Sequence, residues 1–367
     1  MSVGHRIRFF RFSLILLSAV WSASASANLP NFTTTSLCDA RVVALGELPS
    51  HGEAAVQEAR ASITRELVER CGFEQVLFES TAVEFLSLNH GDATQRKLDN
   101  ALGGFLNSDN LRGFREWLLD RIVQGTLVVG GIDDQVGASA EYSRATLPAL
   151  VREASGAGEC GAAVERNLFW RYDDLAPYDA SEKYLLFSCL ARSAGRGRTA
   201  EDGFAIDALL RLYGREASID AFGTRDSSMA TSALWHVLRD PSPKTIIWAA
   251  NTHIAKAQGP MGTVPMGHYL SSDLGNAYKA VGFTVLDGES GRLGRDPHPL
   301  DPLPPNSLEH RLLKGANGGR SYGAEDALAR HAWLSSRILG EIGEADWSQL
   351  FDGVVVIPAT KAPSYSE

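Results

Sequence analysis

Glu47 and His51 stand four residues apart in a short segment, residues 46–52, that has a glycine at each end. A carboxylate at this spacing can orient an imidazole and raise its basicity. An imidazole with a pKa of about 7 can take a proton from water at neutral pH. The segment is therefore a candidate for general base catalysis. The alternative is that Ser50 or His51 only caps the helix expected to start near Ala54.

Polar or ionisable side chains also follow the other expected strands at the points where they end. The set comprises Glu47 after residues 41–45, Glu79 after residues 75–78, Asp133 after residues 126–130, and Asn251 and His253 after residues 244–249. In open α/β sheets, ligands bind beyond the carboxyl ends of the strands. Any one of these side chains could be a cap or a surface residue, but together they predict a site at one rim of a sheet.

Short apolar strands alternate with helical segments along most of the chain. The expected strands are residues 41–45, 75–78, 126–130, 244–249, 276–286 and 353–357. Residues 54–70 have helical spacing, and Cys71-Gly72 ends that helix. Apolar strands between helices are typical of a parallel sheet covered on both faces. We therefore predict an α/β fold with a mostly parallel central sheet flanked by helices.

Two segments depart from this alternation. Residues 140–223 are helical by pattern, without a convincing strand, and are expected to form a helical insertion or cap. The α/β core domain would then comprise residues 28–139 and 224–367. Residues 287–323 are rich in Gly and Pro, and we expect a long loop that is functional or mobile.

The first 27 residues are expected to be a cleaved signal peptide. They contain a basic n-region (His5, Arg6, Arg8, Arg11), an apolar h-region (Phe12–Trp21) and a small-x-small cleavage site (Ala25-Ser26-Ala27). The apolar run is shorter than the roughly 20 residues that span a bilayer. We therefore expect cleavage after Ala27, no membrane anchor, and a periplasmic or secreted protein. Cleavage removes three Arg and no acid, which takes the net charge from −9 to −12 and argues against nucleic acid or an anionic membrane as partner.

The four cysteines are an even number, which in an exported protein permits disulfides. Cys38 and Cys71 each precede an expected strand. Because neighbouring parallel strands start at the same edge of a sheet, a Cys38–Cys71 bond is geometrically plausible. A Cys160–Cys189 bond would join two expected helices. The alternative for all four is a buried free thiol.

Other common catalytic motifs are missing from the sequence. It has no Gly-x-Ser-x-Gly elbow, no P-loop, no Gly-x-Gly-x-x-Gly after a strand and no HExxH. A metal site built from Glu47, His51, Glu53 and His253 remains an alternative, although the spacing of these residues is not diagnostic.

Five blocks of sequence, in order, cover most of the chain after residue 27. They are residues 44–47 with 51–52, Arg60, Leu67, 72–73 and 76–79; 117–118 with 131–133; 225–226 with 229–230; 246–249 with 251–254; and 266–267 with 274–275 and 282–283. Weaker matches follow at residues 307–309 and 351–352. In these blocks the chain resembles the erythromycin-esterase family of bacterial hydrolases.

The resemblance implies a sheet with a helical cap, a cleft between them, and hydrolysis of a small-molecule ester or lactone without a metal, a cofactor or a covalent serine. His51 matches the general base that activates water, and Glu47 would orient it. Arg60 and Glu79 match a buried charged pair, although the pattern alone favours a solvated surface arginine at position 60. His253 matches a second histidine that stabilises the oxyanion or protonates the leaving alcohol.

Four further residues are expected to bind substrate: Asp133, Asn251, Glu53 and Arg225. Arg225 and Asp226 are expected to open a helix, where the helix dipole favours an acid.

The chain departs from the family pattern at three places. Three residues separate Glu47 from His51, where the family usually has two, and Ala250 stands where the family often has histidine. The family has an acidic residue shortly after the base, at the position that Ala55 occupies here, and Glu53 is close enough to replace it. Two other functions stay open for this reason. One is a haem- or ligand-binding module in which His51 or His253 ligates iron, and the other is a catalytically degenerate member of the family.

Overall fold

The computed structural model describes residues 37–88, 92–137, 140–173, 179–216, 221–314, 316 and 319–366. The expected signal peptide, residues 1–27, lies outside the described residues. Among the helices that are described, none is both long enough and apolar enough to cross a membrane.

The core is an eight-stranded sheet in the order β3-β2-β4-β1-β5-β10-β7, with β6 paired to the end of β5. The strands are β1 (Val42–Leu45), β2 (Phe73–Thr81), β3 (Val128–Asp133), β4 (Lys244–Trp248), β5 (Tyr278–Ser290), β6 (His298–Pro299), β7 (Ser321–Ala324) and β10 (Gly353–Thr360). All neighbours from β3 to β10 are parallel, and β7 and β6 pair antiparallel at the periphery. β8 (Ser335–Ser336) and β9 (Gly343–Glu344) form a separate hairpin. The prediction of an α/β fold with a mostly parallel sheet is confirmed.

Helices cover both faces of this sheet. One face packs against α1 (Ala54–Cys71), α2 (Gln95–Leu102) and α3 (Arg112–Val123). The other packs against α8 (Ala221–Arg239), α10 (Met266–Leu274), α11 (Leu308–Leu313), α12 (Glu325–Arg330) and α13 (Trp347–Leu350). In β1, Val43 and Leu45 face the first group of helices, whereas Val42 and Ala44 face the second. Because both faces are buried, β1 (VVAL) is apolar along its whole length.

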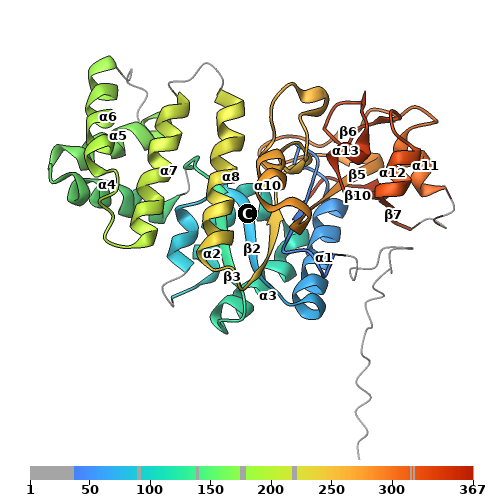
Figure 1. Ribbon diagram of the computed structural model, residues 1–367, viewed down its shortest axis with the longest axis horizontal. Coiled ribbons are helices and arrows are strands. Elements are labelled where there is room, and N and C mark those ends of the chain that lie inside the picture. The colour runs from blue at the N-terminus through green and yellow to red at the C-terminus, as the bar shows by residue number, and fades with distance from the viewer. Residues whose placement is uncertain are drawn as a thin grey trace, which may run out of the picture.

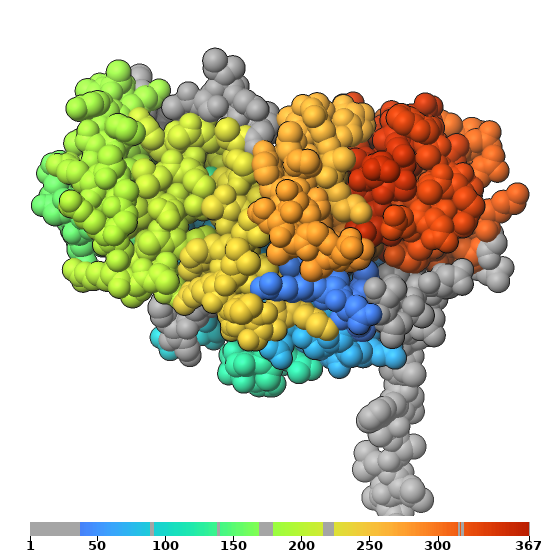
Figure 2. Space-filling model, in the orientation of Figure 1, coloured from blue at the N-terminus to red at the C-terminus, as the bar shows by residue number. Residues whose placement is uncertain are grey.

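Between β3 and β4, the chain leaves the sheet and forms α4 (Glu141–Ser155), α5 (Glu159–Asp173), α6 (Ala180–Ser193) and α7 (Ala200–Glu216) before it enters α8. These four helices share an apolar cluster that extends to Ala82, Val83 and Leu86, just after β2. Figure 1 shows them grouped at one end of the molecule, with α11–α13 at the other. In Figure 2 the surface of this helical insertion lies against that of α8.

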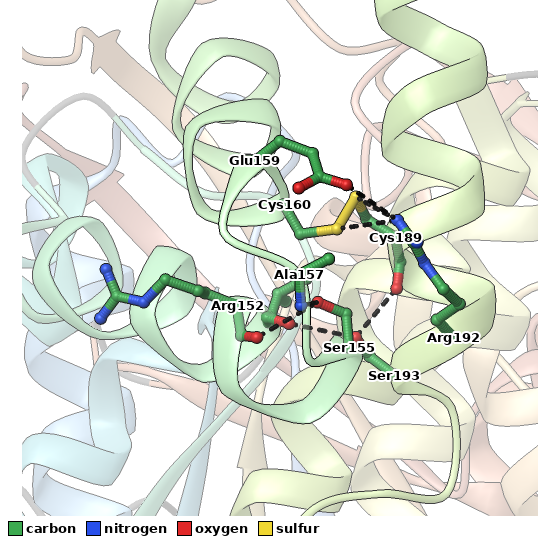
Figure 3. Close-up of a disulfide and its surroundings, with 9 residues drawn as sticks. Arg152, Ser155, Ala157, Glu159, Cys160, Cys189, Arg192 and Ser193 are labelled. Atoms are coloured by element: carbon green, nitrogen blue, oxygen red, sulfur yellow. Dashed lines mark hydrogen bonds and ion pairs between the residues drawn. A yellow bond between two sulfur atoms is a disulfide. The ribbon is translucent and has the colours of Figure 1, made fainter.

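Both disulfides expected from the sequence are present. Cys38–Cys71 joins the segment before β1 to the end of α1, and Cys160–Cys189 joins α5 to α6. Figure 3 shows Arg192 directed at the second bond, with its Nη2 3.2 Å from the Sγ of Cys160. The first bond ties the start of the sheet to α1, and the second ties together two helices of the insertion.

Two expectations about the local structure are wrong. Residues 287–323 are not one long loop, because they contain the end of β5, β6, α11 and the start of β7. Helix α8 begins at Ala221, so Arg225 and Asp226 lie in its second turn rather than at its start.

Candidate active site

Glu47 lies just beyond the carboxyl end of β1 and contacts two basic side chains with one oxygen. Its Oε1 is 3.1 Å from Nδ1 of His51 and 2.7 Å from Nη1 of Arg60. The carboxylate therefore holds the imidazole, as the spacing predicts. The capping alternative is wrong, since α1 has Glu53 at its N-cap position and no side chain caps it.

The backbone of His51 is in the left-handed region, with a φ of 55°. Its N–H donates to the carbonyl of Leu48 at 3.0 Å, which closes a tight turn. Its ring stacks on Phe105, with the centroids 5.2 Å apart and the planes 5° from parallel. Such a backbone costs on the order of 1 kcal/mol or more and persists where its surroundings fix it. Here it presents the imidazole to the cavity described below.

Arg60 is fully buried, contrary to the pattern-based expectation of a surface arginine. Its Nη2 donates to the carbonyl of Leu45 at 3.0 Å, and its guanidinium lies 4.3 Å from the ring centre of Trp248. Arg60 pairs with Glu47 and not with Glu79, so the expected Arg60–Glu79 pair is wrong. The order of the strands explains this, because β4, which carries Trp248, separates β1 from β2.

Arg225 of α8 is the centre of a second cluster of charges. Its Nη2 is 3.0 Å from Oε1 of Glu79, near the end of β2, and 2.7 Å from Oδ2 of Asp133, the last residue of β3. Its Nε lies 3.4 Å from the other oxygen of Asp133. Asp133 and Arg225, both expected to bind substrate, thus bind each other. Glu79 also accepts the backbone N–H of Ala250 at 2.8 Å, at the position where the family pattern often has histidine.

His253, in α9 (Asn251–Ile254), has partners on both ring nitrogens. Nδ1 is 2.8 Å from Oδ1 of Asp226, and Nε2 is 3.3 Å from both Oε1 of Glu79 and Nη1 of Arg225. Asp226 also accepts the N–H of Met266 at 2.8 Å, so it holds His253 and α10. His253 does not line the cavity described below, but it contacts Glu79 and Arg225, which do. With both nitrogens occupied it is a poor candidate for a haem ligand, and no contact of the described residues favours the haem-binding alternative.

These contacts change the protonation of both histidines. Burial alone would lower the pKa of His51, but the negative charge of Glu47 and its hydrogen bond raise it. Burial alone would raise the pKa of Glu47, but Arg60 and His51 lower it. Burial likewise opposes the charged form of His253, yet Glu79 and Asp226 raise the pKa of His253 to about 10. His253 is therefore protonated at neutral pH.

Asn251 and Glu53 do not face the cavity, so their expected roles in substrate binding are wrong. Asn251 is fully buried and bonds to the backbone of Phe283 and Ile338 at 2.7 to 3.0 Å, which fastens the end of β4 to β5. Glu53 accepts Ser50 Oγ at 2.7 Å and the N–H of Gly52 at 3.2 Å. The alternative metal set of Glu47, His51, Glu53 and His253 therefore does not converge on one point.

A cavity of about 220 Å³ lies at the rim of the sheet. Its lining includes Glu47, His51, Glu79, Phe105, Asp133, Arg225 and Arg292. A second cavity, of about 440 Å³, shares Glu79, Phe105 and Asp133 and extends under the helical insertion to Asn167, Leu168, Leu212 and Arg215. The arrangement places a polarised imidazole, paired charges and a partly apolar chamber together, which suits the binding of a neutral or singly charged organic molecule beside a base.

The sequence analysis missed Phe105 and Arg292. Phe105 lies in a short 3-10 helix, Gly104–Leu106, and Arg292 lies in the segment after β5. Phe105 does not follow a strand, and Arg292 follows β5 without a recognisable motif. Only the three-dimensional contact of their segments with residues 51–52 brings them to the site.

Comparisons with known proteins agree with the observed fold. A family model described as erythromycin esterase matches residues 136–360, more than half of the chain, which include Arg225 and His253 but not Glu47 or His51. Over 76 residues the chain is 36% identical to the erythromycin esterase type II of Escherichia coli, a stretch that covers 19% of this chain and only 18% of that protein. Two solved structures share the fold. One, described as a succinoglycan biosynthesis protein, has a TM-score of 0.70 at 19% identity and covers 89% of this chain and 90% of its own. The other, a mutant of the erythromycin esterase EreC in its open conformation, has a TM-score of 0.61 at 20% identity and covers 90% and 93%.

Proposed function

Because the chain belongs to the erythromycin esterase family, we propose that it is a carboxylic ester hydrolase that cleaves an ester or lactone with water activated by His51. The observation that carries the proposal is the His51 imidazole, which lines the cavity while Glu47 holds its Nδ1. This contact assigns the proton of the neutral ring to Nδ1 and leaves Nε2 as the acceptor.

In the proposed reaction, Nε2 of His51 takes a proton from a water molecule as the water oxygen bonds to the carbonyl carbon of the ester. The C=O electron pair moves to the oxygen and forms a tetrahedral oxyanion. When that intermediate collapses, the C–O bond to the alcohol breaks, and the imidazolium returns its proton to the leaving oxygen. Glu47 stabilises the imidazolium, and Arg60 keeps Glu47 ionised.

Arg225 is the proposed donor to the oxyanion. It lines the cavity, and the carboxylates of Glu79 and Asp133 hold its guanidinium in place. A donor fixed before the reaction stabilises developing charge without reorganisation. His253, which does not line the cavity, is then a positioning residue for Glu79 rather than the direct donor expected from the sequence.

Export to the periplasm or the medium is part of the proposal. Two disulfides support it, because such bonds persist in oxidising compartments. The four insertion helices would serve as the cap over the larger cavity, to which Asn167 and Leu212 contribute.

An assay of the purified mature chain against para-nitrophenyl esters and macrolide lactones in ¹⁸O-labelled water tests the proposal. We expect turnover of at least one ester, one ¹⁸O atom in the acid product, and no acylated protein by mass spectrometry. No hydrolysis of any member of the panel, or an acyl group retained on the protein, would contradict it.

A further inference from the structure

Three arginines lie at or beside the smaller cavity, and two of them are neutralised. Arg60 pairs with Glu47, and Arg225 pairs with Glu79 and Asp133. The third, Arg292, lines the same cavity. Within the described ranges its guanidinium has neither a carboxylate at ion-pair distance nor a hydrogen-bond acceptor, and the guanidinium carbon lies 5.5 Å from the centre of the Phe105 ring.

Arg292 is held at a fixed place relative to the base. The N–H of Gly291, the residue before Arg292, donates at 3.1 Å to the carbonyl of Gly52, the residue after His51. This backbone hydrogen bond joins the two segments. A Cβ at Gly52 would come within 2.7 Å of the Gly291 nitrogen, so the contact requires glycine. Phe105 then touches both side chains, since its ring stacks on His51 and lies under Arg292.

A guanidinium that lacks a counter-ion and lines a cavity is suited to bind an anion. Its planar fork matches the two oxygens of a carboxylate. Three carboxylates, Glu47, Glu79 and Asp133, line the same cavity and would repel a dianion. The geometry therefore favours one singly charged group, placed a short distance from the ester carbonyl that the water activated by His51 attacks.

We propose that Arg292 binds a carboxylate carried by the substrate, so that the preferred substrates are esters with a free acid group. This proposal rests on the proposed hydrolase function and specifies its substrate class. Arg292 would act in binding and not on the reacting carbonyl, a role assigned above to Arg225.

Two matched esters separate these roles: mono-para-nitrophenyl adipate, which carries a terminal carboxylate, and para-nitrophenyl hexanoate, which has the same chain length without it. For Arg292→Gln we expect the KM for the adipate ester to rise about tenfold or more with kcat nearly unchanged, because a hydrogen-bonded charge pair is lost. The hexanoate ester should be unaffected. Arg292→Lys, which keeps the charge but loses the fork, should give an intermediate KM. Arg295→Gln, at an exposed position in the same segment, is the control and should change neither ester.

An equal loss of kcat for both esters would overturn the proposal, because it would place Arg292 at the reacting carbonyl. No change for either ester would also overturn it. If the wild-type chain hydrolyses neither ester, the hydrolase function fails, but calorimetric titration with adipamate, the singly charged monoamide of adipic acid, still tests Arg292. Tighter binding of adipamate to wild type than to Arg292→Gln supports the anion site, and equal or absent binding overturns it.

Discussion

Replacing His51 with Asn should lower kcat/KM for ester hydrolysis by about 10²- to 10⁴-fold, the usual contribution of a positioned general base. Asn is the informative substitution because position 51 has a φ of 55°, which Asn tolerates better than Ala. Its amide can still donate to Glu47, so the buried carboxylate keeps a partner while the base is lost. Steady-state kinetics on the best ester of the panel measures the effect.

His268→Asn is a matched control for this variant. His268 is exposed on α10 and does not line either cavity, so its loss should leave kcat/KM within about twofold of wild type. If His51→Asn retains wild-type turnover while it remains folded, the base is another group and the mechanism is wrong.

Replacing Arg225 with Met should destabilise the protein by about 3–5 kcal/mol, because it leaves Asp133 buried without a counter-charge and Glu79 with His253 as its remaining one. The same change removes the proposed oxyanion donor, so hydrolysis should also fall by about 10²-fold or more even where the protein is fully folded. Urea unfolding monitored by circular dichroism gives the first quantity, and kinetics below the unfolding transition gives the second.

The Arg96–Glu141 pair supplies the control, since its two side chains are 77% and 55% exposed. Arg96→Met should leave the free energy of unfolding nearly unchanged, as is usual for surface pairs. A cost for Arg225→Met as small as that for Arg96→Met would mean that the Glu79–Asp133 cluster does not depend on the arginine.

The strand ends were the most predictable part of the site. Glu47, Glu79, Asp133 and His253 come together because parallel strands end at the same edge, and the apolar runs that precede them are plain in the sequence. Which side chains pair could not be predicted. The pairing depends on the order β2-β4-β1, and the sequence does not reveal that β4 enters between two strands that are consecutive in the chain.

Asn251 and Glu53 show a second limit of sequence-based prediction. Both lie beside rim residues, and only the direction of each side chain separates a cavity-lining role from a structural one. Asn251 points into the sheet, where a Cβ on Gly46 would come within 1.9 Å of its Oδ1, and Glu53 folds back on its own turn. Arg292 could not be predicted for a different reason. Its segment reaches the site through a backbone contact with Gly52 that no local sequence pattern encodes.

The pH dependence of kcat/KM for wild type and Glu47→Gln tests the central claim most directly. Burial alone would lower the pKa of His51, and the charge of Glu47 overcomes this and raises it. His51 acts as a base only when neutral, so wild-type activity should rise with pH through that raised pKa. Gln removes the negative charge but keeps an acceptor for Nδ1–H, so the acid limb should move to lower pH while the maximal rate falls. An acid limb that stays in place or moves to higher pH would contradict the assignment of His51 as the base that Glu47 controls.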